Sequence, residues 1–134
     1  MLRKVFIIVL CVLAVLSCKK ESRNGEAAEV AVTGGVADLT PNSVTLIAHF
    51  NPGSLMSDYQ TEMRCSSTTE LTPGSSSGYV WSGTLESVEN GEYRYKYTNL
   101  LPGTTYYYQA VLYYYSFKRI YYHGQVKQFT TPVQ

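Results

Sequence analysis

The chain has 134 residues, of which 45% are hydrophobic and 16% are charged, and its formal net charge is +1. A near-neutral chain lacks the basic excess of nucleic-acid-binding proteins, so we expect no nucleic-acid partner. The length is enough for one domain with a modest core.

The first 17 residues have the pattern of a secretory signal peptide. Arg3 and Lys4 precede an apolar run over residues 5–16, and the small residue Ser17 follows it. Twelve helical residues cover roughly 18 Å of a hydrocarbon core that is roughly 30 Å thick. We therefore expect residues 1–17 to be removed, which takes away Arg3 and Lys4 and changes the net charge from +1 to −1.

Val15, Leu16, Ser17 and Cys18 resemble the lipobox of bacterial lipoproteins, in which the signal peptide is cut just before a lipidated cysteine. The resemblance implies that Cys18 carries the lipid and starts the mature chain. Lys19 follows in place of Asp, which implies an outer-membrane destination, and the charged tail is similar to those of Bacteroidetes lipoproteins. Whether the protein faces the periplasm or the surface stays open, and plain secretion and a retained anchor are the alternatives.

The segment 18–29 is charged and small and has no apolar periodicity, so we expect a flexible tether. Its residues from Lys19 onward reach roughly 35 Å when extended. With Cys11 removed and Cys18 lipidated, Cys65 is left without a disulfide partner. We expect Cys65 to be a small buried core residue.

From Val30 onward the sequence predicts strands and turns without a helix. Residues 44–50 alternate as a strand whose inner face holds Val44, Leu46, Ala48 and Phe50. The next strand places a second set of residues on its inward face and its polar residues on its outward face. That inner set is Tyr59, Thr61, Met63 and Cys65.

The second half of the chain continues as hairpins. Residues 71–78 read as a loose surface loop, and Asn90 and Gly91 predict a tight turn between strands over 81–88 and 92–99. Further along we expect a long strand over 106–115, a hairpin tip over 117–123 and a final strand over 125–131.

The segment from Leu100 to Tyr106 matches the L-x-P-x-T-x-Y pattern of fibronectin type III domains, through Leu100, Pro102, Thr104 and Tyr106. The resemblance implies that residues 30–132 form an all-β, immunoglobulin-like sandwich of the fibronectin type III type with about seven antiparallel strands. It also implies a tyrosine corner, in which the Tyr106 hydroxyl reaches a backbone group a few residues upstream. The tryptophan of the family's second strand is absent, and the one tryptophan is Trp81.

The chain holds thirteen tyrosines, and strand alternation divides them between core and surface. We expect an inward set of Tyr93, Tyr95, Tyr97, Tyr108, Ala110, Leu112 and Tyr114. Tyr107, Val111, Tyr113 and Tyr115 then point outward and, with Phe117, Ile120, Tyr121 and Tyr122, form an aromatic strip. The candidate binding face consists of Tyr107, Tyr113, Tyr115, Tyr121 and Tyr122. The alternative is that these rings serve packing alone.

The sequence shows no motif of catalytic or metal-binding residues. His49 and His123 have no acid at ligand or triad spacing, and no calcium, phosphate or zinc motif occurs. We expect no enzyme activity, no metal and no cofactor. The sequence favours a noncatalytic, lipid-anchored envelope protein that binds an envelope or extracellular protein. Carbohydrate binding through the exposed tyrosines and assembly through an edge strand are the alternatives.

Overall fold

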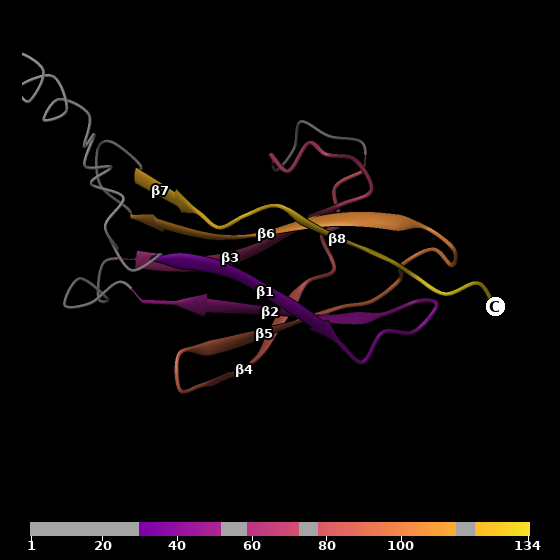
Figure 1. Ribbon diagram of the computed structural model, residues 1–134, viewed down its shortest axis with the longest axis horizontal. Coiled ribbons are helices and arrows are strands. Elements are labelled where there is room, and N and C mark those ends of the chain that lie inside the picture. The colour runs from indigo at the N-terminus through magenta and orange to yellow at the C-terminus, as the bar shows by residue number, and fades with distance from the viewer. Residues whose placement is uncertain (1–29, 52–58, 73–77, 115–119) are drawn as a thin grey trace, which may run out of the picture.

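The computed structural model describes residues 30–51, 59–72, 78–114 and 120–134. Within these residues the fold is all-β, with eight strands in two antiparallel sheets that pack face to face (Figure 1). Residues 1–29, which hold the predicted signal peptide, Cys18 and the tether, lie outside the described part. In the described part, no helix is long and apolar enough to cross a membrane.

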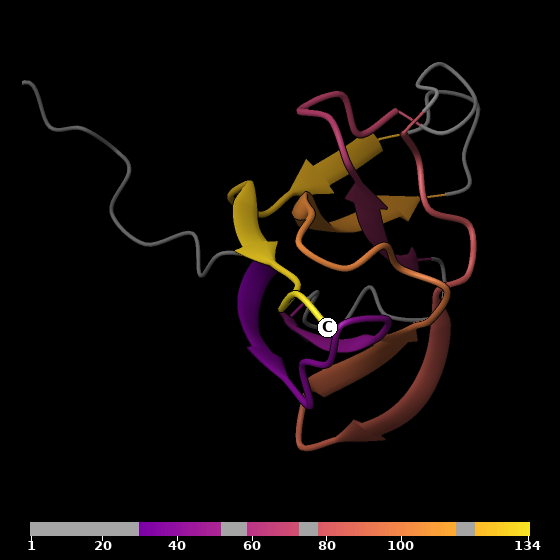
Figure 2. The same cartoon turned by 90° about the vertical axis from the view of Figure 1, so that its right-hand side faces the viewer.

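The two sheets have four strands each, and Figure 2 shows them as two layers. The first sheet has the order β1-β2-β5-β4, with bounds β1 (Ala31–Ala37), β2 (Val44–Phe50), β5 (Glu92–Tyr97) and β4 (Thr84–Glu89). The second sheet consists of β3 (Tyr59–Ser66), β6 (Thr105–Tyr114), β7 (Ile120–His123) and β8 (Lys127–Thr130). In this sheet β3 pairs with one edge of β6. β7 and β8 pair with two different stretches of the opposite edge of β6.

The predicted strand over 44–50 and the predicted tight turn are confirmed. The inner face of β2 is buried as the alternation requires. Asn90 and Gly91 have φ angles of 51° and 78°, which are the left-handed values of a type I′ hairpin. The strand before this turn begins at Thr84 rather than at residue 81, so Trp81 precedes it.

The core between the sheets is rich in tyrosine. Tyr93, Tyr95 and Tyr97 of β5 are all buried, and they face Met63 and Cys65 on the other sheet. Burial of each large apolar side chain contributes roughly 1.5–3 kcal/mol. The predicted burial of Cys65 and of these three tyrosines is confirmed.

The last strand of the domain is divided in two. We expected a hairpin tip over 117–123, but residues 120–123 form β7, because β6 is ten residues long and offers pairing positions to both β7 and β8. Between β7 and β8, Thr33 of β1 contacts β6: the Thr33 Oγ1 accepts a hydrogen bond from the Ala110 N–H at 3.0 Å. A Cβ atom on Gly124 would lie 2.5 Å from this oxygen, so only glycine fits at that position. The break gives eight strands where about seven were expected.

Two residues that we expected at the surface are buried. Leu71 is buried although it begins the predicted surface loop. Val111 points to the outer side of its sheet as predicted, yet it is fully buried. Its register neighbours are Glu62 on β3 and His123 on β7, so larger polar side chains flank it on both sides.

Candidate binding surface

The predicted aromatic strip is only partly assembled on the outer face of the second sheet. Tyr107 and Tyr113 are on this face and are half-buried, and the Tyr113 hydroxyl donates a hydrogen bond to Gln60 Oε1 at 2.5 Å. Tyr115 and the side chain of Tyr121 lie outside the described residues. The described part of this face therefore presents half-buried tyrosines, one of them hydrogen-bonded, and not a strip of fully exposed aromatic rings.

Tyr122 is on the other side of the sheet from the strip to which we assigned it. It pairs with Leu112, and residues opposite each other in a sheet share a face. Its ring centroid is 5.9 Å from that of Tyr59, at the edge of the core. The register of β7 on β6 places Tyr122 there.

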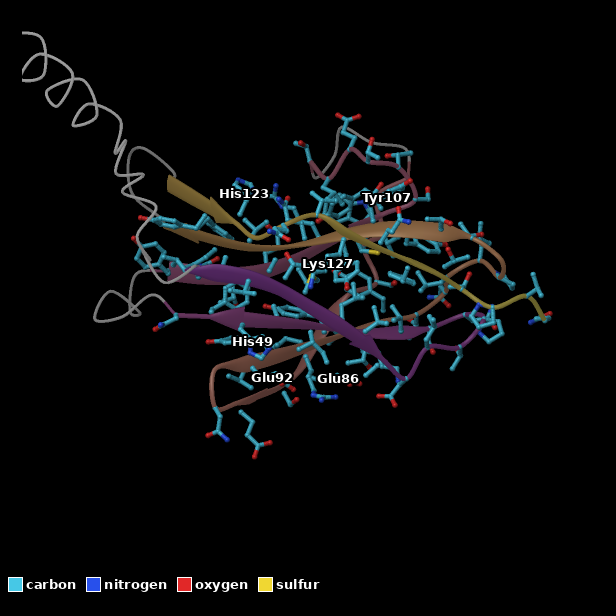
Figure 3. The ribbon with its side chains drawn as sticks, in the orientation of Figure 1. His49, Glu86, Glu92, Tyr107, His123 and Lys127 are labelled. Carbon is cyan, nitrogen blue, oxygen red and sulfur yellow. The ribbon has the colours of Figure 1, made fainter. Side chains whose placement is uncertain are left out.

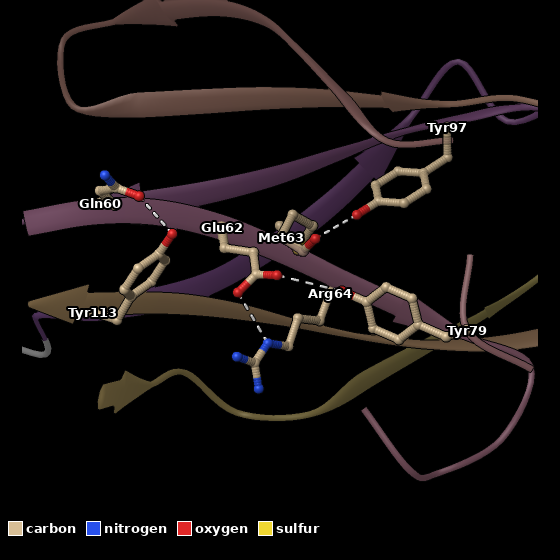
Figure 4. A network of polar contacts seen from close by, with 7 residues as sticks. All are labelled: Gln60, Glu62, Met63, Arg64, Tyr79, Tyr97 and Tyr113. Atoms are coloured by element: carbon tan, nitrogen blue, oxygen red, sulfur yellow. Dashed lines mark hydrogen bonds and ion pairs between the residues drawn. The ribbon is translucent and has the colours of Figure 1, made fainter. Parts of the chain in front are cut away.

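A polar network covers the outer face near the edge strand β3 (Figure 4). Arg64 Nε lies 3.1 Å from Glu62 Oε2, and the Arg64 side chain is only 11% exposed. The Tyr79 hydroxyl donates to the other carboxylate oxygen, Glu62 Oε1, at 3.4 Å. Burial and the Glu62 charge raise the pKa of Tyr79 above its ordinary value, so this hydroxyl keeps its proton.

The two histidines lie on opposite outer faces of the sandwich (Figure 3). His49 is opposite Glu92 in the register of β2 and β5. Burial and the nearby Arg64 guanidinium lower the pKa of His123 below its ordinary value of 6.5. The Glu62 carboxylate opposes this shift in the pKa of His123, so each histidine has an acid near it in space that sequence spacing did not show. Among the described residues, no three His, Cys, Asp or Glu side chains gather as a metal site.

Trp81 is the most exposed aromatic side chain of the described residues, at 69%. Its ring centroid lies 4.6 Å from that of Tyr79, with the planes tilted by 55°. The chain is fixed on both sides of it. The Val80 N–H donates to the Cys65 carbonyl at 2.9 Å, and Ser82 Oγ donates to the Thr98 carbonyl at 2.6 Å.

Two hollows adjoin Trp81. One of about 190 Å³ lies between the edge of β3 and the β4–β5 hairpin, and its lining includes Glu62, Tyr79, Trp81, Leu85 and Tyr95. The other, of about 350 Å³, has a lining that includes Ser67, Tyr79, Trp81, Asn99 and Leu101. Tyr79, Val80 and Trp81 line both hollows, so the aromatic pair of Tyr79 and Trp81 lies where the two hollows adjoin.

The corner before β6 fixes Leu101 beside the second hollow. The Leu101 N–H donates to the Tyr106 hydroxyl at 2.9 Å, and Thr131 Oγ1 donates to the Leu101 carbonyl at 2.6 Å. Asn99 and Gly103 have φ angles of 58° and 59°. With its backbone held at both groups, Leu101 keeps its side chain 65% exposed.

Trp81 and Leu101 lie at the end of the sandwich opposite the first described residue. Val30 accepts a hydrogen bond from the Asn51 N–H, next to the end of β2. At the start of β2, Val44 pairs with Tyr97, whose neighbour Thr98 binds Ser82. The seven residues of β2 extend about 20 Å, which separates the two ends.

No protein-family model matches the sequence, and no curated protein matches it. The solved structures that are similar in fold include two of the sensor domain of the anti-sigma factor RsgI4 in Pseudobacteroides cellulosolvens. A shorter form of that domain has a TM-score of 0.56 at 12% identity, over 81% of this chain and 100% of that one. The solution structure of the domain has a TM-score of 0.51 at 12% identity, over 77% and 74%. At such identity the likeness shows the fold alone, an all-β sandwich of two antiparallel sheets.

Proposed function

We propose that the protein is a noncatalytic lipoprotein of a bacterial cell envelope, anchored in the outer membrane through Cys18. Its sandwich mediates interaction or adhesion with a partner beyond the membrane. The lipobox-like residues before Cys18 and the tether over residues 18–29 support the anchor. A lipid chain contributes roughly 0.8 kcal/mol per buried methylene, and two or more chains hold a protein stably on a bilayer.

The sandwich is of the fibronectin type III type in this proposal. Its strand order, β1-β2-β5-β4 against β3-β6-β7/β8, is the four-plus-three order of constant-type immunoglobulin domains, so the fibronectin type III assignment rests on the corner motif from Leu100 to Tyr106. The contact between Tyr106 and Leu101 has the geometry of a tyrosine corner, in which a residue near the start of the sixth strand binds the backbone upstream.

One observation carries the binding role: Trp81, the most exposed aromatic ring of the part of the chain that the structure describes, lies at the end opposite Val30. A tether that joins the domain at Val30 directs the opposite end away from its membrane. Exposed apolar side chains gathered in one place indicate an interaction surface, and tryptophan is enriched among the residues that dominate binding energy. Leu101 adds a second exposed apolar side chain across the adjoining hollow.

Fractionation of cells that produce the full chain tests the anchor. Cys18→Ala should move the protein from the membrane to the soluble fraction, while Cys11→Ala, a matched change inside the signal peptide, should leave it in the membrane. Protease treatment of intact cells then shows whether the domain faces outward. Attachment that survives Cys18→Ala would contradict the proposal.

Binding is tested with the same cells, using the envelope fraction as the source of partners. Trp81→Ala should release the partner, and Tyr107→Ala, on the outer sheet face, should retain it. Equal retention by both variants would remove Trp81 from the binding surface.

A further inference from the structure

We infer that the hollow between Trp81 and Glu62 is a subsite for one neutral sugar ring of a glycan. The inference rests on the proposed function, since it names the chemical class of the partner that the displayed domain binds. It places the sugar at Trp81, on the edge of the sandwich, and not at the tyrosines of the outer face.

The first observation is a fixed aromatic platform. Trp81 is largely exposed although burial of its ring would be favourable, and Tyr79 supports it from one side. The hydrogen bonds of Val80 and Ser82 hold the backbone on either side, so little order has to be imposed when a ligand arrives. A flat, rigid indole of this kind fits the apolar C–H face of a pyranose ring.

The second observation is a fixed acceptor in the same hollow. The Glu62 carboxylate is held by Arg64 at one oxygen and by Tyr79 at the other. Each carboxylate oxygen has two acceptor positions, so both oxygens keep the capacity to accept a sugar hydroxyl. Hydrogen bonds to a charged acceptor are about twice as strong as neutral ones.

Tyr79 couples the two halves of the site. Its ring packs on Trp81 while its hydroxyl binds Glu62, so one side chain sets the distance between platform and acceptor. On the floor of the hollow, the Tyr95 hydroxyl donates to Thr61 Oγ1 at 3.0 Å, and the Thr61 hydroxyl has its own proton to donate. The lining therefore offers an acceptor, a donor and an apolar face, which are the three features of a sugar ring.

The size and the charge of the hollow further restrict which sugars it can bind. The hollow of about 190 Å³ is smaller than the pockets of roughly 300 Å³ and more that hold drug-sized ligands, so it accommodates one ring. The Glu62 carboxylate disfavours an acidic sugar, because two negative charges would meet at short range. One ring gives weak binding, and many anchored copies facing a repetitive glycan would add avidity.

The test uses the full-length chain purified in detergent, with mannopentaose, cellopentaose and chitotetraose as neutral probes and polygalacturonate as the acidic one. Trp81 is the sole tryptophan of the chain, so stacking of a sugar changes the intrinsic tryptophan fluorescence directly. Calorimetry supplies the affinities of variants that lack this reporter. We expect at least one neutral probe to bind and polygalacturonate to give no signal.

Substitutions at Trp81 and at Glu62 test the aromatic platform and the hydrogen-bond acceptor separately. Trp81→Ala should weaken binding about tenfold or more, Trp81→Phe should keep part of the affinity, and Glu62→Gln should weaken it several-fold. Tyr113→Phe, which removes a hydroxyl from the outer face, is the matched control and should bind as the parent does. Thermal unfolding of every variant shows that the loss is local.

The outcomes distinguish this inference from the proposed function. Absence of binding to every neutral probe, or equal binding after Trp81→Ala, overturns the sugar subsite. If the chain then still captures a purified envelope protein through Trp81, the proposed function stands with a protein partner. If Trp81→Ala changes neither kind of binding, both fail.

Discussion

The Tyr97 hydroxyl donates a hydrogen bond to the backbone carbonyl of Met63, joining the two sheets across the core (Figure 4). Tyr97→Phe leaves that carbonyl buried without this donor, and we expect the free energy of unfolding to fall by about 1–3 kcal/mol. Urea denaturation measures the change. Tyr113→Phe removes a hydroxyl from an exposed contact instead, and an equal loss in both variants would contradict the role of burial.

The corner at Tyr106 gives a second prediction. Its hydroxyl is the acceptor for the Leu101 N–H, so Tyr106→Phe should expose that amide to exchange. We expect faster hydrogen exchange at Leu101 and a loss of about 1 kcal/mol in stability. Tyr107→Phe is the neighbouring control on the opposite face, and unchanged exchange at Leu101 in Tyr106→Phe would show that the contact does not protect the amide.

Cys65 should be chemically silent in the folded protein. It is fully buried, and desolvation raises the pKa of its thiol to about 12, so at neutral pH almost no thiolate is present to react. Incubation of the protein with iodoacetamide should leave Cys65 unmodified until urea unfolds the domain, as followed by mass spectrometry. Modification at full rate without denaturant would mean that the core opens around β3.

His123 should make the domain less stable in mild acid. Burial and Arg64 lower its pKa in the folded state, so the unfolded chain takes up a proton first as the pH falls through 6.5. The contribution of His123 is complete above about pH 6.5 and is lost below it, down to the folded-state pKa. The stability of the parent relative to His123→Gln should fall as the pH drops through that interval, and a difference that is constant from about pH 8 to 5 would oppose this account.

Local patterns were enough to predict most of the strands. In β2 the alternation of Val44, Leu46 and Ala48 requires one buried face, and the structure buries it. Asn90 and Gly91 adopt the left-handed values that a two-residue hairpin needs. These features depend on neighbours within a few residues, which the sequence displays.

Features that depend on pairing between distant segments were not predictable. The face of Tyr122 follows from its register with Leu112, and one residue of slip would have reversed it. Trp81 lies outside β4 because the Ser66–Tyr79 bridge and the Val80 N–H attach the preceding segment to β3 before the chain crosses to the first sheet as β4. The hollow beside Glu62 arises from that crossing. The sequence contains Trp81, but no periodicity of apolar residues around it predicts that its side chain faces solvent.

The break between β7 and β8 has a consequence for crowding. A long unpaired strand edge invites a strand from a neighbouring molecule, which is the first step of aggregation. Here the Gly124 N–H binds the Ala110 carbonyl and the Gln109 amide binds the Gly124 carbonyl, so the two four-residue pieces do not form one continuous edge. Under the proposed lipid anchor, copies packed densely on a bilayer would meet an interrupted template at this edge, so their sheets would not join edge to edge.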